Sequence, residues 1–176
     1  MTNSEQFFSW EGFGLSLHIP ENSLPPETDC CTIHINASVE GNYIFPENSY
    51  LVSAVYWFRC VPKCKFSKSI TLEIQHCAKQ DNLHTLSFVK TTSIEGQSLY
   101  MFRKTTGCSQ TSHGVFPSHS SYGFIQVDGF CGYGVTQESS EDRQYRANLY
   151  YLAQGVSRCQ IHFAVFWNTD VHYSVS

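Results

Sequence analysis

Alternation of apolar and polar residues is the dominant pattern along the chain, and it predicts short β-strands. Leu15, Leu17 and Ile19 alternate with polar residues, and the same alternation runs over residues 32–39. A period of two residues is typical of half-buried strands. Further strands are predicted at residues 50–58, 69–77, 85–90, 98–103, 123–127, 149–152, 160–167 and 171–175. No window of about 12 residues carries the pattern of an amphipathic helix.

The spacing of these strands predicts an all-β fold. Short strands separated by turn residues at intervals of about 10–15 residues favour an antiparallel β-sandwich, here over residues 7–136. Residues 137–147 are polar and rich in charge, which predicts a linker. Residues 148–176 carry two or three more strands, too few for a stable domain. They are predicted to form a partial second β unit or to add strands to the first.

Composition excludes several classes of protein. Aromatic residues make up 15% of the chain and charged residues also 15%, the opposite of a disordered segment. The net charge of −4 gives no electrostatic basis for binding nucleic acid. No apolar run approaches the roughly 18–20 residues of a membrane-spanning helix. An excess of aromatic side chains over what one core can bury predicts an apolar surface that meets a partner.

The termini and the cysteines bear on location and metal content. Residues 1–6 show no basic region followed by an apolar stretch, so we predict no signal peptide and a cytoplasmic protein. A partner or a longer chain holding it at the inner face of the membrane is the open alternative. The redox state of the eight cysteines stays open. Cys60 and Cys64 are spaced like half a zinc site, but His76 and Cys77 are adjacent and form no second spaced pair. We therefore expect no metal and no cofactor.

Four segments, in order, resemble the ZU-5 domain of zonula occludens scaffold proteins, netrin receptors, ankyrins and a self-cleaving death-domain adaptor. Residues 12–25 are similar to the family's opening Gly-rich strand and its Ile-Pro-x-x-Ala/Ser-Leu turn. Residues 43–57 are similar to its central strand, and residues 66–77 resemble Phe-x-Lys-Pro-Val-x-Leu-x-Ile-Pro-His. In that third segment Ser69 and Gln75 stand where the family usually has proline. Residues 127–133 lie where relatives carry a His-Phe-Ser segment on the closing strand.

The resemblance implies a ZU-5-like β-sandwich that acts as a protein–protein interaction or scaffold module of an adaptor or receptor tail, without a cofactor and without catalytic turnover. The implied partner is a helical cytoskeletal protein or a neighbouring β-type or death-type domain of the same polypeptide. In ankyrins a basic face of the domain meets spectrin, which makes Lys63, Lys65 and Lys68 candidate binding residues. The alternative for these lysines is a solvated rim.

Self-cleavage is the alternative function that the resemblance implies. In some relatives the Ser hydroxyl attacks the preceding carbonyl, a His moves the proton and backbone strain lowers the barrier. Here Cys131 stands at the position of the nucleophile, after Phe130, while Gly129 replaces the His. A second candidate bond is Tyr173–Ser174, with His172 two residues before Ser174. The missing base at Gly129 favours the non-catalytic hypothesis.

Overall fold

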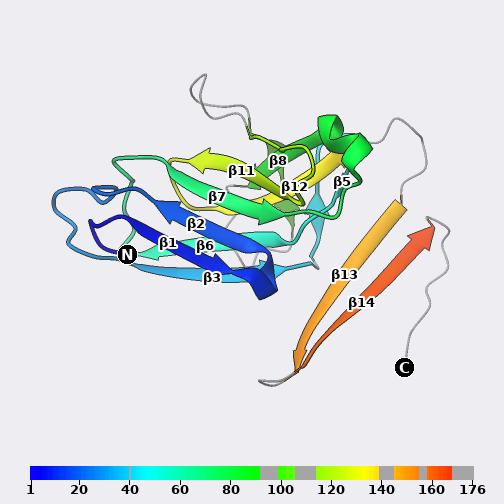
Figure 1. Ribbon diagram of the computed structural model, residues 1–176, viewed down its shortest axis with the longest axis horizontal. Helices are drawn as coiled ribbons and strands as arrows, with labels where there is room; N and C mark the ends of the chain where they lie inside the picture. The colour runs from blue at the N-terminus through cyan, green and yellow to red at the C-terminus, as the bar shows by residue number, and fades with distance from the viewer. Residues whose placement is uncertain (40, 92–98, 106–113, 139–144, 155–157, 168–176) are drawn as a thin grey trace.

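The fold is all-β, as predicted from the alternation. A computed structural model describes residues 1–39, 41–91, 99–105 and 114–138, and the backbone of residues 145–154 and 158–167 (Figure 1). Its only helices in these ranges are two short 3₁₀ turns, η1 (Glu11–Phe13) and η2 (Gln80–Thr85). Almost all strand pairs are antiparallel.

Two antiparallel sheets pack together. The four-stranded sheet has the order β1–β2–β7–β11, with β1 at Gln6–Trp10, β2 at Leu15–Ile19, β7 at Ile70–Gln75 and β11 at Tyr122–Val127. The six-stranded sheet has the order β10–β8–β12–β6–β3, with β5 added beside β12. Its strands are β3 (Thr32–Ser38), β5 (Ser49–Leu51), β6 (Val55–Val61), β8 (Leu86–Thr91), β10 (Arg103–Lys104) and β12 (Gly132–Glu138). β1 and β3 therefore lie at sheet edges.

The main core lies between the two sheets. Alternate residues of β2 and β7 point into it, and Leu17, Ile19, Leu72 and Ile74 are fully buried there. The six-stranded sheet contributes residues such as Tyr56 and Val135 to the same cluster. Burial of this apolar surface is the main source of the stability of the fold.

A second apolar cluster covers the opposite face of the six-stranded sheet. Val55 and Trp57 alternate along β6 with Tyr56 and point away from the main core. They pack against Phe102 and against aromatic residues next to the parallel pair β4 (Tyr43–Ile44) and β9 (Tyr100–Met101). Tyr100, for example, lies 4.7 Å from Trp57 between ring centroids. This cluster accounts for part of the high aromatic content that composition alone assigned to a partner-binding surface.

The predicted strand over residues 50–58 is two strands, β5 and β6. Both pair with β12, but residues 52–55 face only residues 134–135 of that strand, which makes a bulge. Ser53 stabilises the bulge, because its Oγ accepts a hydrogen bond from Val135 N at 2.8 Å and donates to Ala54 O at 2.7 Å. The apolar pattern runs through this break, which is why it predicted one strand.

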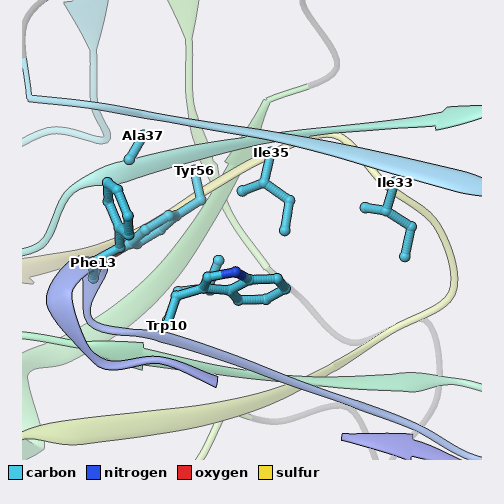
Figure 2. Close-up of a pocket in the computed structure, with 7 residues that line it drawn as sticks. Trp10, Phe13, Ile33, Ile35, Ala37 and Tyr56 are labelled. Carbon is cyan, nitrogen blue, oxygen red and sulfur yellow. The ribbon is translucent and has the colours of Figure 1, made fainter. Parts of the chain in front are cut away.

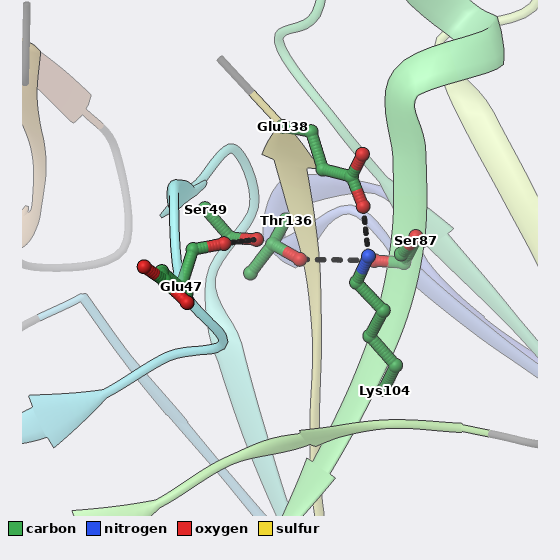
Figure 3. A network of polar contacts seen from close by, with 6 residues as sticks. All are labelled: Glu47, Ser49, Ser87, Lys104, Thr136 and Glu138. Carbon is green, nitrogen blue, oxygen red and sulfur yellow. Dashed lines mark hydrogen bonds and ion pairs between the residues drawn. The ribbon is translucent and has the colours of Figure 1, made fainter. Parts of the chain in front are cut away.

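The end of β12 is fixed by polar contacts (Figure 3). The Lys104 ammonium pairs with the Glu138 carboxylate, and Thr136 Oγ1 donates to Ser87 O at 3.4 Å. β12 reaches Glu138, so the predicted linker at 137–147 begins two residues inside a strand. Residues 139–144 lie outside the described ranges, and β13 (Tyr145–Gln154) follows. β13 pairs with β14 (Arg158–Trp167) in an antiparallel hairpin.

Candidate functional site

An apolar groove lies between the edge strands of the two sheets and has a volume of about 270 Å³. β1, η1 and β2 supply one wall, and β3 and β6 supply the other (Figure 2). The side chains of Ile33 and Ile35 point from β3 toward the indole of Trp10. The full lining is Trp10, Phe13, Leu15, Ile33, Ile35, Ala37 and Tyr56.

The turn that carries Phe13 is held rigidly at the rim of the groove. Tyr56 is buried, and its hydroxyl donates to the carbonyl of Phe13 and, at 3.3 Å, to that of Gly14. Burial raises the pKa of Tyr56 well above its ordinary value, so this donor stays protonated. Gly14 closes η1 with φ +62°, a conformation that favours glycine, and its carbonyl accepts from Gln75 N at 2.9 Å. Phe13 is consequently presented with 52% of its surface exposed.

The two edge strands lack the usual protection against pairing with other chains. Natural edge strands commonly carry lysine, proline or a bulge. β1 (Gln6–Trp10) and β3 (Thr32–Ser38) contain neither charged residues nor proline. The two strands lie on opposite sides of the groove, so the apolar lining is flanked by two strand edges without charged residues.

The predicted lysine patch lies on the segment between β6 and β7. Lys63 and Lys65 flank Cys64 in the loop after β6, and Lys68 precedes β7; all three are exposed. The loop with Lys63 and Lys65 follows the end of β6 that pairs with the beginning of β3, where Cys60 is the register partner of the groove residue Ile33. None of the three lysines is among the residues that line the groove.

Cys131 lies half-buried directly before β12, packed against the main core. Its Sγ donates to Gly132 O at 3.6 Å, and burial raises the pKa of its thiol. The side chains acting on this thiol in the described residues are those of Tyr133 and Lys90, not an imidazole or a carboxylate. Phe130 is anchored between rings, stacked on Phe58 at 5.1 Å. The other candidates for self-cleavage, His172 and Ser174, lie outside the described residues.

Three cysteines, Cys31 and the closely spaced Cys60 and Cys64, meet at the beginning of β3. Cys31 directly precedes β3, Cys60 is near the end of β6 and Cys64 is in the following loop. Their Sγ atoms all lie within 4.8 Å of one another, and Cys60 Sγ is 3.6 Å from Cys64 Sγ. Burial raises the pKa of the Cys60 and Cys31 thiols, while the N-terminal ammonium acts in the opposite direction on Cys31. Sulfur is the donor that soft metal ions prefer, so this cluster is a candidate metal site.

His76 is a buried histidine that belongs neither to the groove lining nor to the cysteine cluster. It is 4% exposed, and its ring packs edge-on against Phe116 at 5.7 Å. Neither ring nitrogen has a hydrogen-bond partner among the described residues. Burial lowers the pKa of this imidazole, so the ring is held in its neutral form.

The groove and the cysteine cluster were not predicted from the sequence. Alternation placed Ile33, Ile35 and Ala37 on one face but gave no sign that this face stays open. Cys60 and Cys64 are spaced like half a metal site, and the third cysteine of the cluster, Cys31, directly precedes a different strand, β3. The β3–β6 register, Ile33 opposite Cys60, brings it there, and register is a long-range property.

Comparison with known proteins gives no family for this chain. No family model and no curated protein sequence matches it. Among the described residues, neither 3₁₀ turn has the length or the apolar character to cross a membrane.

Proposed function

We propose that this chain is a protein-interaction module whose groove binds an extended apolar segment of a partner protein. The observation that carries this function is the apolar groove between two uncharged edge strands, β1 and β3. It agrees with the function that the ZU-5 resemblance implies. It requires no catalytic group and no cofactor.

The size and lining of the groove favour peptide side chains over a small-molecule ligand. Small-molecule sites usually enclose about 300–1,000 Å³ and contain a few converging polar groups. This groove has about 270 Å³, and its lining residues are apolar or aromatic. The lining side chains carry two polar groups, the Tyr56 hydroxyl, which already donates to the carbonyls of Phe13 and Gly14, and the indole N–H of Trp10. Such a space suits apolar side chains of a peptide.

An extended segment fits the geometry better than a helix. In a strand, side chains two residues apart point to the same side, which matches the spacing of Ile33, Ile35 and Ala37 on the groove wall. A segment lying along β1 would continue the four-stranded sheet through main-chain hydrogen bonds and place alternate side chains in the groove. This favours a neighbouring β-type domain, or a strand from another protein, over a helical cytoskeletal partner.

A peptide-display selection tests this function directly. Random peptides of about 12 residues would be selected on the wild-type chain, and binders would be remeasured on Ile35→Lys, which places a charge inside the groove. We expect selected peptides to carry apolar residues at alternate positions and to lose at least about 10-fold in affinity on Ile35→Lys, because the charge would be desolvated.

Val115→Lys is the matched control, since Val115 is 57% exposed, lies outside the groove lining and pairs with Phe124 of β11, at the edge of the sheet opposite β1. It should keep the affinity of the wild type. Peptides that bind both variants equally, or a library that yields no alternating apolar binder, would contradict the proposed function. Circular dichroism of both variants checks that the fold is retained.

A further inference from the structure

We propose that Cys31, Cys60 and Cys64 bind one thiophilic d¹⁰ metal ion, Zn²⁺ or Cu⁺. This site is independent of the groove and of the interaction function proposed above. It differs from the sequence-based expectation of no metal, because the third ligand becomes visible only in the folded chain.

The distances suit a shared metal ion. A tetrahedral zinc ion with Zn–S bonds of about 2.3 Å holds two sulfur ligands about 3.8 Å apart. Cys60 Sγ and Cys64 Sγ are 3.6 Å apart, and the three Sγ atoms lie within 4.8 Å of one another. A disulfide would require about 2.05 Å. The three thiols are free and already converge on one point.

The fold positions each ligand from a different segment. Cys31 and Ile33 are two residues apart and face the same side of the sheet, and Ile33 is the register partner of Cys60. Cys31 and Cys60 are therefore diagonal neighbours on one face. Cys64 returns to this face through the loop after β6 and packs against the main core. Two sheet strands and one loop thus hold the ligands before any metal binds, which lowers the cost of ordering them.

The N-terminal residues cover the cluster. Met1 N donates to Cys31 O and Cys31 N to Met1 O, both at 3.0 Å. The Cys31 thiol lies 3.5 Å from the thioether Sδ of Met1, a further soft donor. Cys31 is only 5% exposed, while Cys60 and Cys64 are half-buried, so a metal ion could enter past Cys64.

The donor set selects the class of metal. The cluster contains sulfur atoms and, within the described residues, no carboxylate or imidazole. Thiolates and thioethers prefer Zn²⁺ and Cu⁺ to the hard ions Mg²⁺ and Ca²⁺. Each thiol loses its proton to solvent when it binds, so three thiolates with Zn²⁺ carry one net negative charge. The exposed Lys63 and Lys65 on either side of Cys64, together with the N-terminal ammonium, supply positive charge near this end of β3.

Metal binding by the reduced full-length chain tests the site. Zn²⁺ and Co²⁺ would be titrated against a chromogenic chelator, and Cu⁺ would be titrated anaerobically against a Cu⁺-specific chelator. We expect one ion per chain and, with Co²⁺, the sulfur-to-metal charge-transfer absorption of a multi-thiolate site. Saturating metal should raise Tm by about 5–10 °C, because only the folded chain presents the ligands together. The metal arm that binds more tightly identifies the ion.

The variants separate this site from the other cysteines. Cys64→Ser, at a half-buried loop position, and Cys31→Ser should each weaken binding at least about 100-fold and remove the Tm shift. Cys30→Ser is the matched control, since Cys30 is adjacent to Cys31 but exposed and outside the cluster. It should bind like the wild type. Alkylation followed by mass spectrometry should show that metal protects Cys31, Cys60 and Cys64 and not Cys77, which is exposed.

Two results would overturn the metal site. One is that the fully reduced wild type binds neither Zn²⁺ nor Cu⁺ more tightly than Cys64→Ser does. The other is that mild oxidation converts Cys60 and Cys64 to a disulfide while metal leaves their alkylation rates unchanged, in which case the cluster is a thiol pair and no metal ligand. Because metal protection of Cys31, Cys60 and Cys64 against alkylation is measured on the wild type, this test remains valid even if Cys31→Ser does not fold.

Discussion

The two ends of β3 differ although one strand with one alternating pattern forms both. At its beginning, Cys31 is 5% exposed and lies beneath Met1, whose backbone pairs with it. Further along, Ile33 and Ile35 are half-buried and Ala37 is exposed, and all three line the open groove. The inward face is sealed where a distant segment covers it and stays accessible elsewhere. Alternation therefore determines which face of a strand is apolar, and tertiary contacts determine whether that face is closed.

The largest difference should appear when equal apolar truncations are made in the sealed and the open regions. Leu17→Ala, at a fully buried position of β2, should lower the free energy of unfolding by about 2–5 kcal/mol because it leaves a cavity. Ile35→Ala should cost about 1 kcal/mol, since its side chain already faces the groove. Urea unfolding measures both. Equal costs would mean that the groove is closed in solution.

Gly14→Ala should loosen the turn that carries Phe13. An alanine at φ +62° is strained, and its Cβ would lie 2.5 Å from Gln75 Oε1, so we expect a loss of about 1–2 kcal/mol in the free energy of unfolding. Peptide affinity should fall with it. Gly129→Ala is the control, because a Cβ there meets nothing within 4 Å. If Gly14→Ala matched this control in urea unfolding, the turn would not depend on glycine.

The pH dependence of the free energy of unfolding tests the burial of His76. Burial lowers the pKa of its imidazole below the ordinary value of about 6.5, so the unfolded chain binds a proton that the native chain does not. Stability should then fall as pH drops below about 6.5, with a limiting slope of about 1.4 kcal/mol per pH unit for one proton. In His76→Leu this part of the slope should disappear. Urea midpoints between pH 7 and 5 measure the effect, and identical slopes in both chains would contradict it.

Ala37→Leu should change stability least and peptide binding most clearly. Its side chain would occupy the space beside Tyr56 and Phe13, so the free energy of unfolding should stay within about 0.5 kcal/mol of the wild type. Peptides selected on the wild type should no longer bind. Retained affinity in a direct binding assay would place the peptide elsewhere on the molecule.

Local alternation of apolar and polar residues predicted those strands in which burial simply alternates along the sequence. β2 has its predicted bounds, Leu15–Ile19, and β3 ends one residue before the predicted position. β12 was not predicted from its own pattern, because it contains Gly132 and Gly134 where a regular strand would show side chains. A Cβ on Gly132 would lie 2.8 Å from Trp57 and from Thr91, so close packing explains this glycine. β12 is therefore a central strand of the six-stranded sheet although its glycines are unusual for one.

The candidate sites depended on contacts between distant segments. Cys31 and Cys60 are 29 positions apart in the chain and meet only through the register of β3 and β6. The groove likewise requires β1 and β3, from different sheets, to lie opposite each other. Cys131 and the three lysines were chosen from resemblance; none of them lines the groove, and Lys63 and Lys65 only flank Cys64 of the cysteine cluster.

The six-stranded sheet buries apolar side chains on both faces, which has a consequence for how sequences of this fold can vary. In β6, Val55, Tyr56, Trp57 and Phe58 are all buried, and successive residues face different clusters. None of these four positions can accept a polar residue without leaving it unsolvated. In β3, by contrast, Thr32, His34 and Asn36 are exposed and can change more freely. A saturation mutagenesis map should therefore show a continuous block of intolerance over residues 55–58 and a two-residue rhythm over residues 32–38.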